Sequence, residues 1–143
     1  MMRHFLSYIA VMAFAASVTG AETDKEVAAR KNALAVAGAF SNDGFKLRDG
    51  HWCGTVEPGK PQVIQVSLYA GNEYWFSLGA TGEAKKLAIS VYDETGKPLS
   101  FDPWSEGSAA AAGFAPGASG PYYLKIDALE GQAATFCLLY SYK

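Results

Sequence analysis

The stretch VIQVSLYAGNEYWFSL, residues 63–78, decides the fold because apolar and polar residues alternate on both sides of a short break at 70–73. Such alternation is typical of β-strands, in which successive side chains point to opposite faces of a sheet. The inward-facing residues expected on the two arms are Ile64, Val66 and Leu68, then Tyr74, Phe76 and Leu78. The short break, Ala-Gly-Asn-Glu, predicts that the two strands form a hairpin with a tight connection.

Comparable strand patterns continue to the end of the chain. The further strands that we expect cover residues 51–56, 87–91, 109–114, 122–127 and 135–142. The alanine run before Gly113 is short, and we interpret it as a strand of small residues that lets another segment pack closely. Turn sequences separate the strands, and one of them, residues 93–97, predicts a hairpin. The pattern predicts an all-β fold, an antiparallel jelly-roll-like β-sandwich of about 7–8 strands with one N-terminal α-helix.

A helix is predicted before the strands. Residues 23–26, Thr-Asp-Lys-Glu, have the form of a capping box, in which side chains satisfy the free backbone N–H groups of a helix start. The sequence Asn-Asp-Gly at 42–44 ends the helix. The apolar stripe expected is Val27, Leu34, Ala37 and Phe40, and the side expected to face water is Lys25, Arg30, Lys31 and Asn32. Because alanines give a helix little to bury, this segment either docks on the sandwich or stands as a loosely held arm.

The first 21 residues have the composition of a signal peptide. A short basic start precedes an apolar run at residues 5–18, and the small residues that follow predict cleavage after Ala21. The run is shorter than the about 20 residues of a membrane helix, so we expect no membrane insertion after cleavage and a periplasmic or secreted location. The expected organisation is a signal peptide at 1–21, a helix or arm at 22–44 and a β-sandwich at 45–143.

The charge of the chain limits its partners. The formal net charge is −2, and no basic cluster exceeds the pair Lys85-Lys86. Nucleic acids and anionic membranes are bound by concentrated Lys and Arg, so we expect neither as a partner. A protein or a glycan remains as a candidate partner. No glycine-rich phosphate loop is present, and we expect no cofactor.

Cys53 and Cys137 are the only cysteines in the sequence. In an oxidising compartment an even pair predicts a disulfide. The alternatives are a metal-binding pair or a nucleophilic thiol. Both are weaker because His51 is the only histidine beyond the signal peptide. A disulfide would connect the start of the domain to its last strand.

Residues 62–143 resemble the bacterial pre-peptidase C-terminal domain family, which consists of small jelly-roll-like sandwiches found in exported proteins. The stretches that carry the resemblance are LYAGNEYWFSL at 68–78, LAISVYDETGKPL at 87–99, SGPYYLKI at 119–126 and FCLLYSY at 136–142. The resemblance implies a non-catalytic module, in some members a matrix- or substrate-binding one. The chain departs from the family in its cysteine pair, in lacking a peptidase domain, and in having Lys-Leu-Ala at 86–88 where an acidic entry is common. This last difference argues against a calcium role.

Aromatic residues are the candidate ligand-binding residues. Tyr69, Trp75, Tyr92 and Tyr123 are all expected to point away from the core, and exposed rings are typical of sugar or peptide recognition. The competing interpretation is that the N-terminal helix or a partner subunit covers them. Two further tryptophans in turn-rich contexts, Trp52 and Trp104, belong either to the same patch or to lids over the core.

No catalytic residue and no metal ligand is predicted, and we expect a binding or accessory protein rather than an enzyme. One alternative is a small secreted hydrolase that uses paired carboxylates, with Asp93, Asp102 and Glu106 as the candidates. Another is a secreted inhibitor that presents the loop at residues 116–121. His51 has no serine partner in a recognisable nucleophile motif, and a structural hydrogen bond is the simpler role for it.

Overall fold

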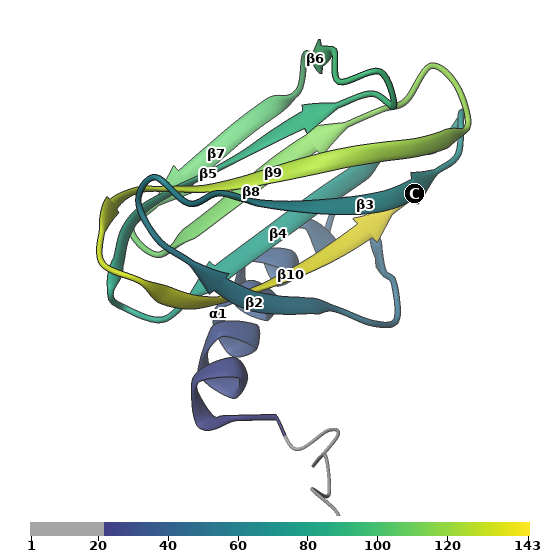
Figure 1. The fold of residues 1–143 in the computed structure, drawn as a ribbon. Coiled ribbons are helices and arrows are strands. Elements are labelled where there is room, and N and C mark those ends of the chain that lie inside the picture. The colour runs from purple at the N-terminus through teal and green to yellow at the C-terminus, as the bar shows by residue number, and fades with distance from the viewer. Residues whose placement is uncertain (1–21) are drawn as a thin grey trace, which may run out of the picture.

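The computed structural model describes residues 22–143, so the predicted signal peptide at 1–21 lies outside the described residues. One helix precedes ten strands (Figure 1). The elements are α1 (Asp24–Ser41), β1 (Lys46–Leu47), β2 (Trp52–Val56), β3 (Gln62–Leu68), β4 (Tyr74–Ala80), β5 (Ala84–Tyr92), β6 (Pro98–Leu99), β7 (Asp102–Glu106), β8 (Ala109–Phe114), β9 (Gly120–Gly131) and β10 (Ala134–Tyr142). Within this part of the chain, no helix combines the length and apolar composition that a membrane crossing requires.

The strands form two antiparallel sheets packed face to face, which confirms the predicted β-sandwich. The larger sheet has the order β1-β10-β4-β8-β7, and β2 also pairs with β10. The smaller sheet has the order β3-β9-β5-β6. Three strands lie outside the expected ranges. β1 and β6 contain only two residues each, and β7 is exposed along its whole length, so none of them leaves an alternating pattern in the sequence.

The predicted inward faces are confirmed. All six residues expected on the two arms of residues 63–78 are at most 9 % exposed, and they join one core cluster. Inward residues of β5 and β9 complete the cluster, including Leu87, Ile89, Leu124 and Ile126. The alternation of the sequence therefore placed the core correctly, since each strand has one face turned to the opposite sheet.

The predicted hairpin of residues 63–78 is wrong. β3 pairs with β9 in the smaller sheet, whereas β4 pairs with β10 and β8 in the larger one. The segment between them crosses from one sheet to the other, and both strands turn their apolar faces to the same core. Alternation determines which face of a strand is buried but not which strand it pairs with. The second predicted hairpin is present, since Val91 pairs with Leu99 around the 93–97 turn.

The helix α1 lies on the outer face of the larger sheet, over β4, β10 and β8 (Figure 1). Its first turn begins as predicted, because Thr23 Oγ1 accepts a hydrogen bond from the Glu26 N–H at 3.2 Å. A Cβ atom at Gly79 of β4 would overlap the backbone nitrogen of Ala33 and lie 2.6 Å from the Ala29 carbonyl oxygen. The helix backbone therefore approaches this strand as closely as a glycine permits.

The predicted helix stripe is right at Ala37, which is buried, and at Phe40, which stacks on Trp75, and wrong at its other two positions. The buried helix residues are Ala29, Ala33, Val36 and Ala37, whereas Val27 and Leu34 are 43 % and 42 % exposed. Larger side chains at the contact would hold the helix away from the sheet, so alanines fill it. Asn32, expected to face water, instead donates from Nδ2 to the Ala80 carbonyl oxygen at 2.8 Å.

The structure joins Cys53 and Cys137 by the predicted disulfide. The two residues lie directly opposite each other on β2 and β10. Cys137 is fully buried beneath the first turn of α1, and its sulfur lies 3.4 Å from the Glu26 carbonyl oxygen. The bond therefore fixes the edge strand β2 to the centre of the sheet that carries the helix.

Replacing Gly79 with alanine tests the close approach of α1. We expect Gly79→Ala to lower the free energy of unfolding by about 1–3 kcal/mol, because the added methyl group forces the helix backbone outward. Gly82→Ala is the matched control, since a Cβ there meets nothing within 4 Å, and it should change stability by less than about 0.5 kcal/mol. Urea unfolding monitored by tryptophan fluorescence measures both. Equal stabilities would show that the helix is not held at contact distance.

Removal of the disulfide should also destabilise the protein. The bridge closes a loop of sequence separation 84, for which the chain-entropy model gives about 4.5 kcal/mol. We expect the double variant Cys53→Ala, Cys137→Ala to lose most of this free energy in the same urea assay. A loss below about 1 kcal/mol would show that the unfolded chain is already restricted in this region.

Candidate functional site

The structure separates the four aromatic residues that the sequence grouped. Trp75 lies on the outer face of β4, beneath the helix. Its ring stacks on Phe40 of α1, with 4.2 Å between ring centroids and 7° between the planes. On the other side, a Cβ at Gly113 would lie 2.8 Å from the indole. Trp75 is thus held between the helix and β8, and it does not share a surface with the other three rings.

Tyr92 and Tyr123 lie on the smaller sheet, far from α1 in the fold. They are directly opposite each other on β5 and β9, and Gln65 of β3 is the next residue along the same row. Both tyrosines are half-buried. They project from the face of this sheet that is turned away from the core, and α1 packs on the other sheet. This row is a flat surface rather than a pocket.

Tyr69 stands at a pocket of about 270 Å³ at one end of the sandwich, which we call the tyrosine pocket. Its lining residues are Arg48, Tyr69, Asn72, Tyr74, Tyr140 and Tyr142. Tyr74 and Tyr142 face each other across β4 and β10, while Tyr69 directly follows β3 of the smaller sheet. The pocket therefore lies where the connection from β3 to β4 crosses between the sheets.

Hydrogen bonds fix part of this pocket. The Tyr74 hydroxyl accepts from the Tyr69 N–H at 2.9 Å and from Asn72 Nδ2 at 3.2 Å, so the crossing connection is tied to the core. The Tyr69 ring itself is 64 % exposed. Its backbone is thus held in place while its ring remains free to contact a ligand.

Tyr140 lines the tyrosine pocket and carries a buried hydroxyl group that forms no hydrogen bond within residues 22–143. The residue is 3 % exposed, and its hydroxyl is buried without a hydrogen-bond partner among the described residues. Trp52 stacks near its ring at 5.7 Å, and the Arg48 guanidinium carbon lies 4.9 Å from the ring centroid. A buried hydroxyl without a partner costs about 1–3 kcal/mol. Because this oxygen is buried, the part of Tyr140 that lines the pocket is its ring.

The sequence reasoning identified Tyr69 but missed the rest of this pocket. The alternation predicts Tyr74 as a core residue, which it is, and places Tyr140 and Tyr142 in the last strand without assigning them to a site. The available signal was the choice of tyrosine at inward positions near strand ends, since a buried tyrosine hydroxyl needs a partner. Arg48 and Asn72 gave no such signal, because only the fold brings their loops to the same end of the sandwich.

The remaining tryptophans divide between core and surface. Trp52 packs against the core beside Tyr140. Trp104 on β7 is 41 % exposed and lines a groove of about 560 Å³ between α1 and the β7-β8 edge. The groove is larger than the tyrosine pocket, but apolar and small side chains dominate its lining, so it offers few polar groups to orient a ligand.

The carboxylates of the hydrolase alternative do not converge on one pocket. Asp93 lines a cavity beside the loop at 116–121, whereas Asp102 lines a different one beside Trp75. Glu106 lies at the exposed end of β7. Asp93 Oδ1 accepts hydrogen bonds from Thr95 Oγ1 at 2.7 Å and from the N–H groups of Thr95 and Lys97. These bonds give its carboxylate a structural role in the turn.

The 116–121 loop of the inhibitor alternative is tied to the sandwich. The Tyr122 hydroxyl donates to the Ala118 carbonyl oxygen at 2.6 Å, and Ser119 Oγ accepts from the Ala70 N–H at 2.9 Å. The second bond connects the loop to the crossing connection beside Tyr69. The loop is thus hydrogen-bonded to the segment that connects β3 of one sheet to β4 of the other.

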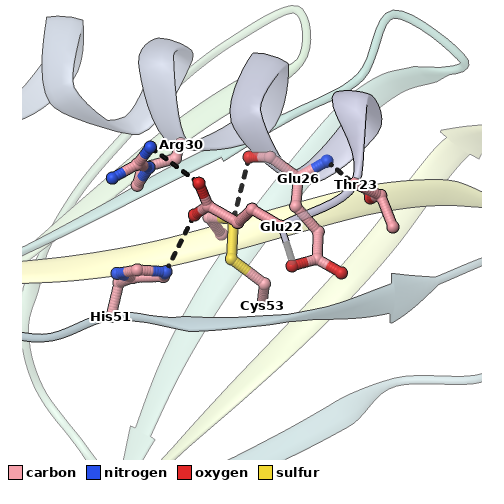
Figure 2. Close-up of a disulfide and its surroundings, with 7 residues drawn as sticks. Glu22, Thr23, Glu26, Arg30, His51 and Cys53 are labelled. Carbon is pink, nitrogen blue, oxygen red and sulfur yellow. Dashed lines mark hydrogen bonds and ion pairs between the residues drawn. A yellow bond between two sulfur atoms is a disulfide. The ribbon is translucent and has the colours of Figure 1, made fainter. Parts of the chain in front are cut away.

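His51 belongs to a polar cluster beside the disulfide (Figure 2). Glu22 connects this cluster to the helix, because its Oε2 lies 2.7 Å from Arg30 Nη2 and its Oε1 lies 3.1 Å from His51 Nε2. Ligand atoms of Glu22, His51 and Cys53 all lie within 4.8 Å of one another. The structural role expected for His51 is consistent with this polar contact to Glu22, the residue that precedes the helix cap.

No family model matches the chain, and no curated protein matches it in sequence. The resemblance to the pre-peptidase C-terminal domain family stays a prediction.

The hydrogen bonds of Asp93 predict a measurable titration. The Thr95 hydroxyl, followed by the Lys97 N–H, holds the pKa of Asp93 below its ordinary 3.8, the opposite of the raised pKa of a general acid. Because the folded pKa is depressed, the stabilisation is complete above pH 3.8 and is lost as the pH falls through the folded pKa. We expect Thr95→Ala to raise the Asp93 pKa toward 3.8, as measured by NMR titration. Thr95→Ser, which keeps the hydroxyl, should leave it low; an unchanged pKa in Thr95→Ala would contradict this assignment.

Proposed function

We propose that this protein is an exported, non-catalytic β-sandwich binding protein that holds one saccharide unit in the tyrosine pocket. The observation that carries the proposal is the pocket itself, where the exposed ring of Tyr69 and the Arg48 guanidinium lie together at one end of the sandwich. The disulfide supports a location in the periplasm or outside the cell, because such bonds persist in oxidising compartments. The resemblance to the pre-peptidase C-terminal domain family also favours a non-catalytic module.

The lining of the tyrosine pocket suits a sugar better than a peptide. A sugar ring has an apolar C–H face that packs on an aromatic ring, and hydroxyl groups around its edge that both donate and accept hydrogen bonds. Tyr69 offers the exposed ring, and Arg48 and Asn72 offer polar groups in the lining of the same pocket. The volume of about 270 Å³ lies just below the range of about 300–1,000 Å³ for drug-sized ligands, and it suits a single small ring.

Arg48 gives the pocket a preference for acidic sugars. Its guanidinium lies over the Tyr140 ring, at the pocket, and can pair with a carboxylate in a bidentate manner. A uronic acid combines the apolar ring face with such a carboxylate. We therefore expect glucuronate or galacturonate to bind more tightly than glucose.

Tyr69→Ala is the direct test of the pocket. The exported protein is titrated with glucuronate, galacturonate and glucose, and binding is followed by saturation-transfer NMR and by the fluorescence of Trp52, which stacks on Tyr140. Loss of one aromatic contact is worth about 0.5–1.5 kcal/mol, so Tyr69→Ala should weaken uronate binding about 2- to 12-fold. Arg48→Gln should remove the preference for uronates over glucose.

Tyr123→Ala is the matched control, because it removes the same kind of ring from the open face of the smaller sheet. It should leave the affinity unchanged. If Tyr123→Ala weakens binding and Tyr69→Ala does not, the ligand lies on the flat row of Tyr92 and Tyr123. If none of the sugars binds, the proposed ligand class is wrong.

A further inference from the structure

The disulfide is surrounded by groups that bind transition metals. Glu22 and His51 lie beside Cys53, and Cys137 is bonded to it (Figure 2). The four residues come from three places in the chain: Glu22 precedes α1, His51 and Cys53 flank the first residue of β2, and Cys137 lies on β10. Two thiolates, one imidazole and one carboxylate form a set that suits tetrahedral zinc. In the oxidised protein the two sulfurs are bonded to each other and are not thiolate ligands.

The positions of Glu22 and His51 also support a metal site formed by these four residues. Glu22 Oε1 is buried and receives no well-aligned hydrogen bond, although His51 Nε2 lies only 3.1 Å away. A cation bound to both atoms would give this carboxylate oxygen the partner that it lacks among the described residues. In tetrahedral zinc with metal–ligand distances near 2.0–2.1 Å, two such ligands lie about 3.3 Å apart. The observed separation is close to this value.

We propose that reduction of the Cys53–Cys137 disulfide converts this cluster into a zinc site with Cys53 Sγ, Cys137 Sγ, His51 Nε2 and Glu22 Oε1 as ligands. A dithiol reductant supplies two electrons and two protons, which break the S–S bond and leave two thiols, while the reductant forms its own disulfide. Zinc then displaces both thiol protons to solvent. Oxidation of the thiolates to the disulfide releases the metal. The site is thus a metal-binding centre that is active only in the reduced protein.

The surrounding structure positions the ligands for this change. Arg30 pairs with the other carboxylate oxygen, Oε2, at 2.7 Å, and so keeps Oε1 turned toward His51. Cys53 and Cys137 face each other across two paired strands, so both sulfurs stay on the same side of the sheet after reduction. They separate to the about 3.8 Å expected between two thiolates on one zinc ion, and Cys137 Sγ, which is outside the group of Glu22, His51 and Cys53, moves toward it. The cluster is partly open, with Glu22 and His51 side chains 25 % and 34 % exposed, which gives the metal a path of entry.

Cobalt is the probe that tests this site, because Co²⁺ bound to thiolates gives charge-transfer absorption and a tetrahedral site gives visible d–d bands. The exported protein is reduced with a phosphine, titrated with Co²⁺ under argon, and then titrated with Zn²⁺. We expect one Co²⁺ per reduced chain with both absorption features, and its displacement by zinc. The oxidised protein should give neither feature.

Variants identify the ligands. His51→Ala and Glu22→Gln should each lose the tetrahedral bands or weaken Co²⁺ binding by more than 10-fold. Arg30→Gln, which changes only the positioning of Glu22, should weaken binding about 10- to 100-fold while the spectrum is kept. Glu26→Gln is the matched control, because it removes a nearby carboxylate in the first turn of α1 without removing a ligand; it should bind as the unmodified protein does.

Three results would overturn the proposal. The first is the absence of a Co²⁺ complex in the reduced protein. The second is an unchanged spectrum and affinity in both His51→Ala and Glu22→Gln, which would mean that the thiolates alone hold the metal. The third concerns folding: circular dichroism follows the reduced chain, and if it unfolds and one equivalent of Zn²⁺ does not restore the folded signal, no such site exists. None of these results depends on the saccharide proposal.

Discussion

The contact between α1 and the outer face of the larger sheet governs the arrangement of this protein. It is a contact of small residues, with Ala29 and Ala33 of the helix set against Gly79 of β4. Because the backbones approach so closely, Ser77 and Leu139 on the outer side of the sheet are buried as completely as the core residues. The sheet is thus covered on both faces, by the second sheet and by the helix, while the smaller sheet is left open on one side.

This arrangement decides which aromatic residues remain available for binding. Trp75 lies under the helix and contributes to stability through its stacking on Phe40. The rings on the open sheet, Tyr92 and Tyr123, form a flat row without converging polar groups. At one end of the sandwich an exposed ring and an arginine line the same pocket, and such groups orient a small polar ligand.

The same helix also places Glu22 beside the disulfide. A helix docked elsewhere would leave Cys53 and Cys137 as a simple cross-strand bridge. Here Glu22, which precedes the helix cap, contacts both Arg30 and His51. The N-terminal end of α1 therefore lies beside the disulfide that joins β2 and β10. Stability and the proposed metal chemistry therefore depend on one docking geometry.

The sequence by itself determined the β-sandwich class, the inward face of each long strand, the helix start at Thr23 and the cysteine pair, because each follows from local periodicity, local capping or parity. It could not determine that β3 and β4 belong to different sheets, since alternation is the same whichever strand is the partner. It also could not show that alanines rather than Val27 and Leu34 face the sheet. Alanines face the sheet because the space beside Gly79 admits only small side chains. The tyrosine pocket forms where the chain crosses from one sheet to the other. Both arise from contacts between residues far apart in the sequence, which only the tertiary structure brings together.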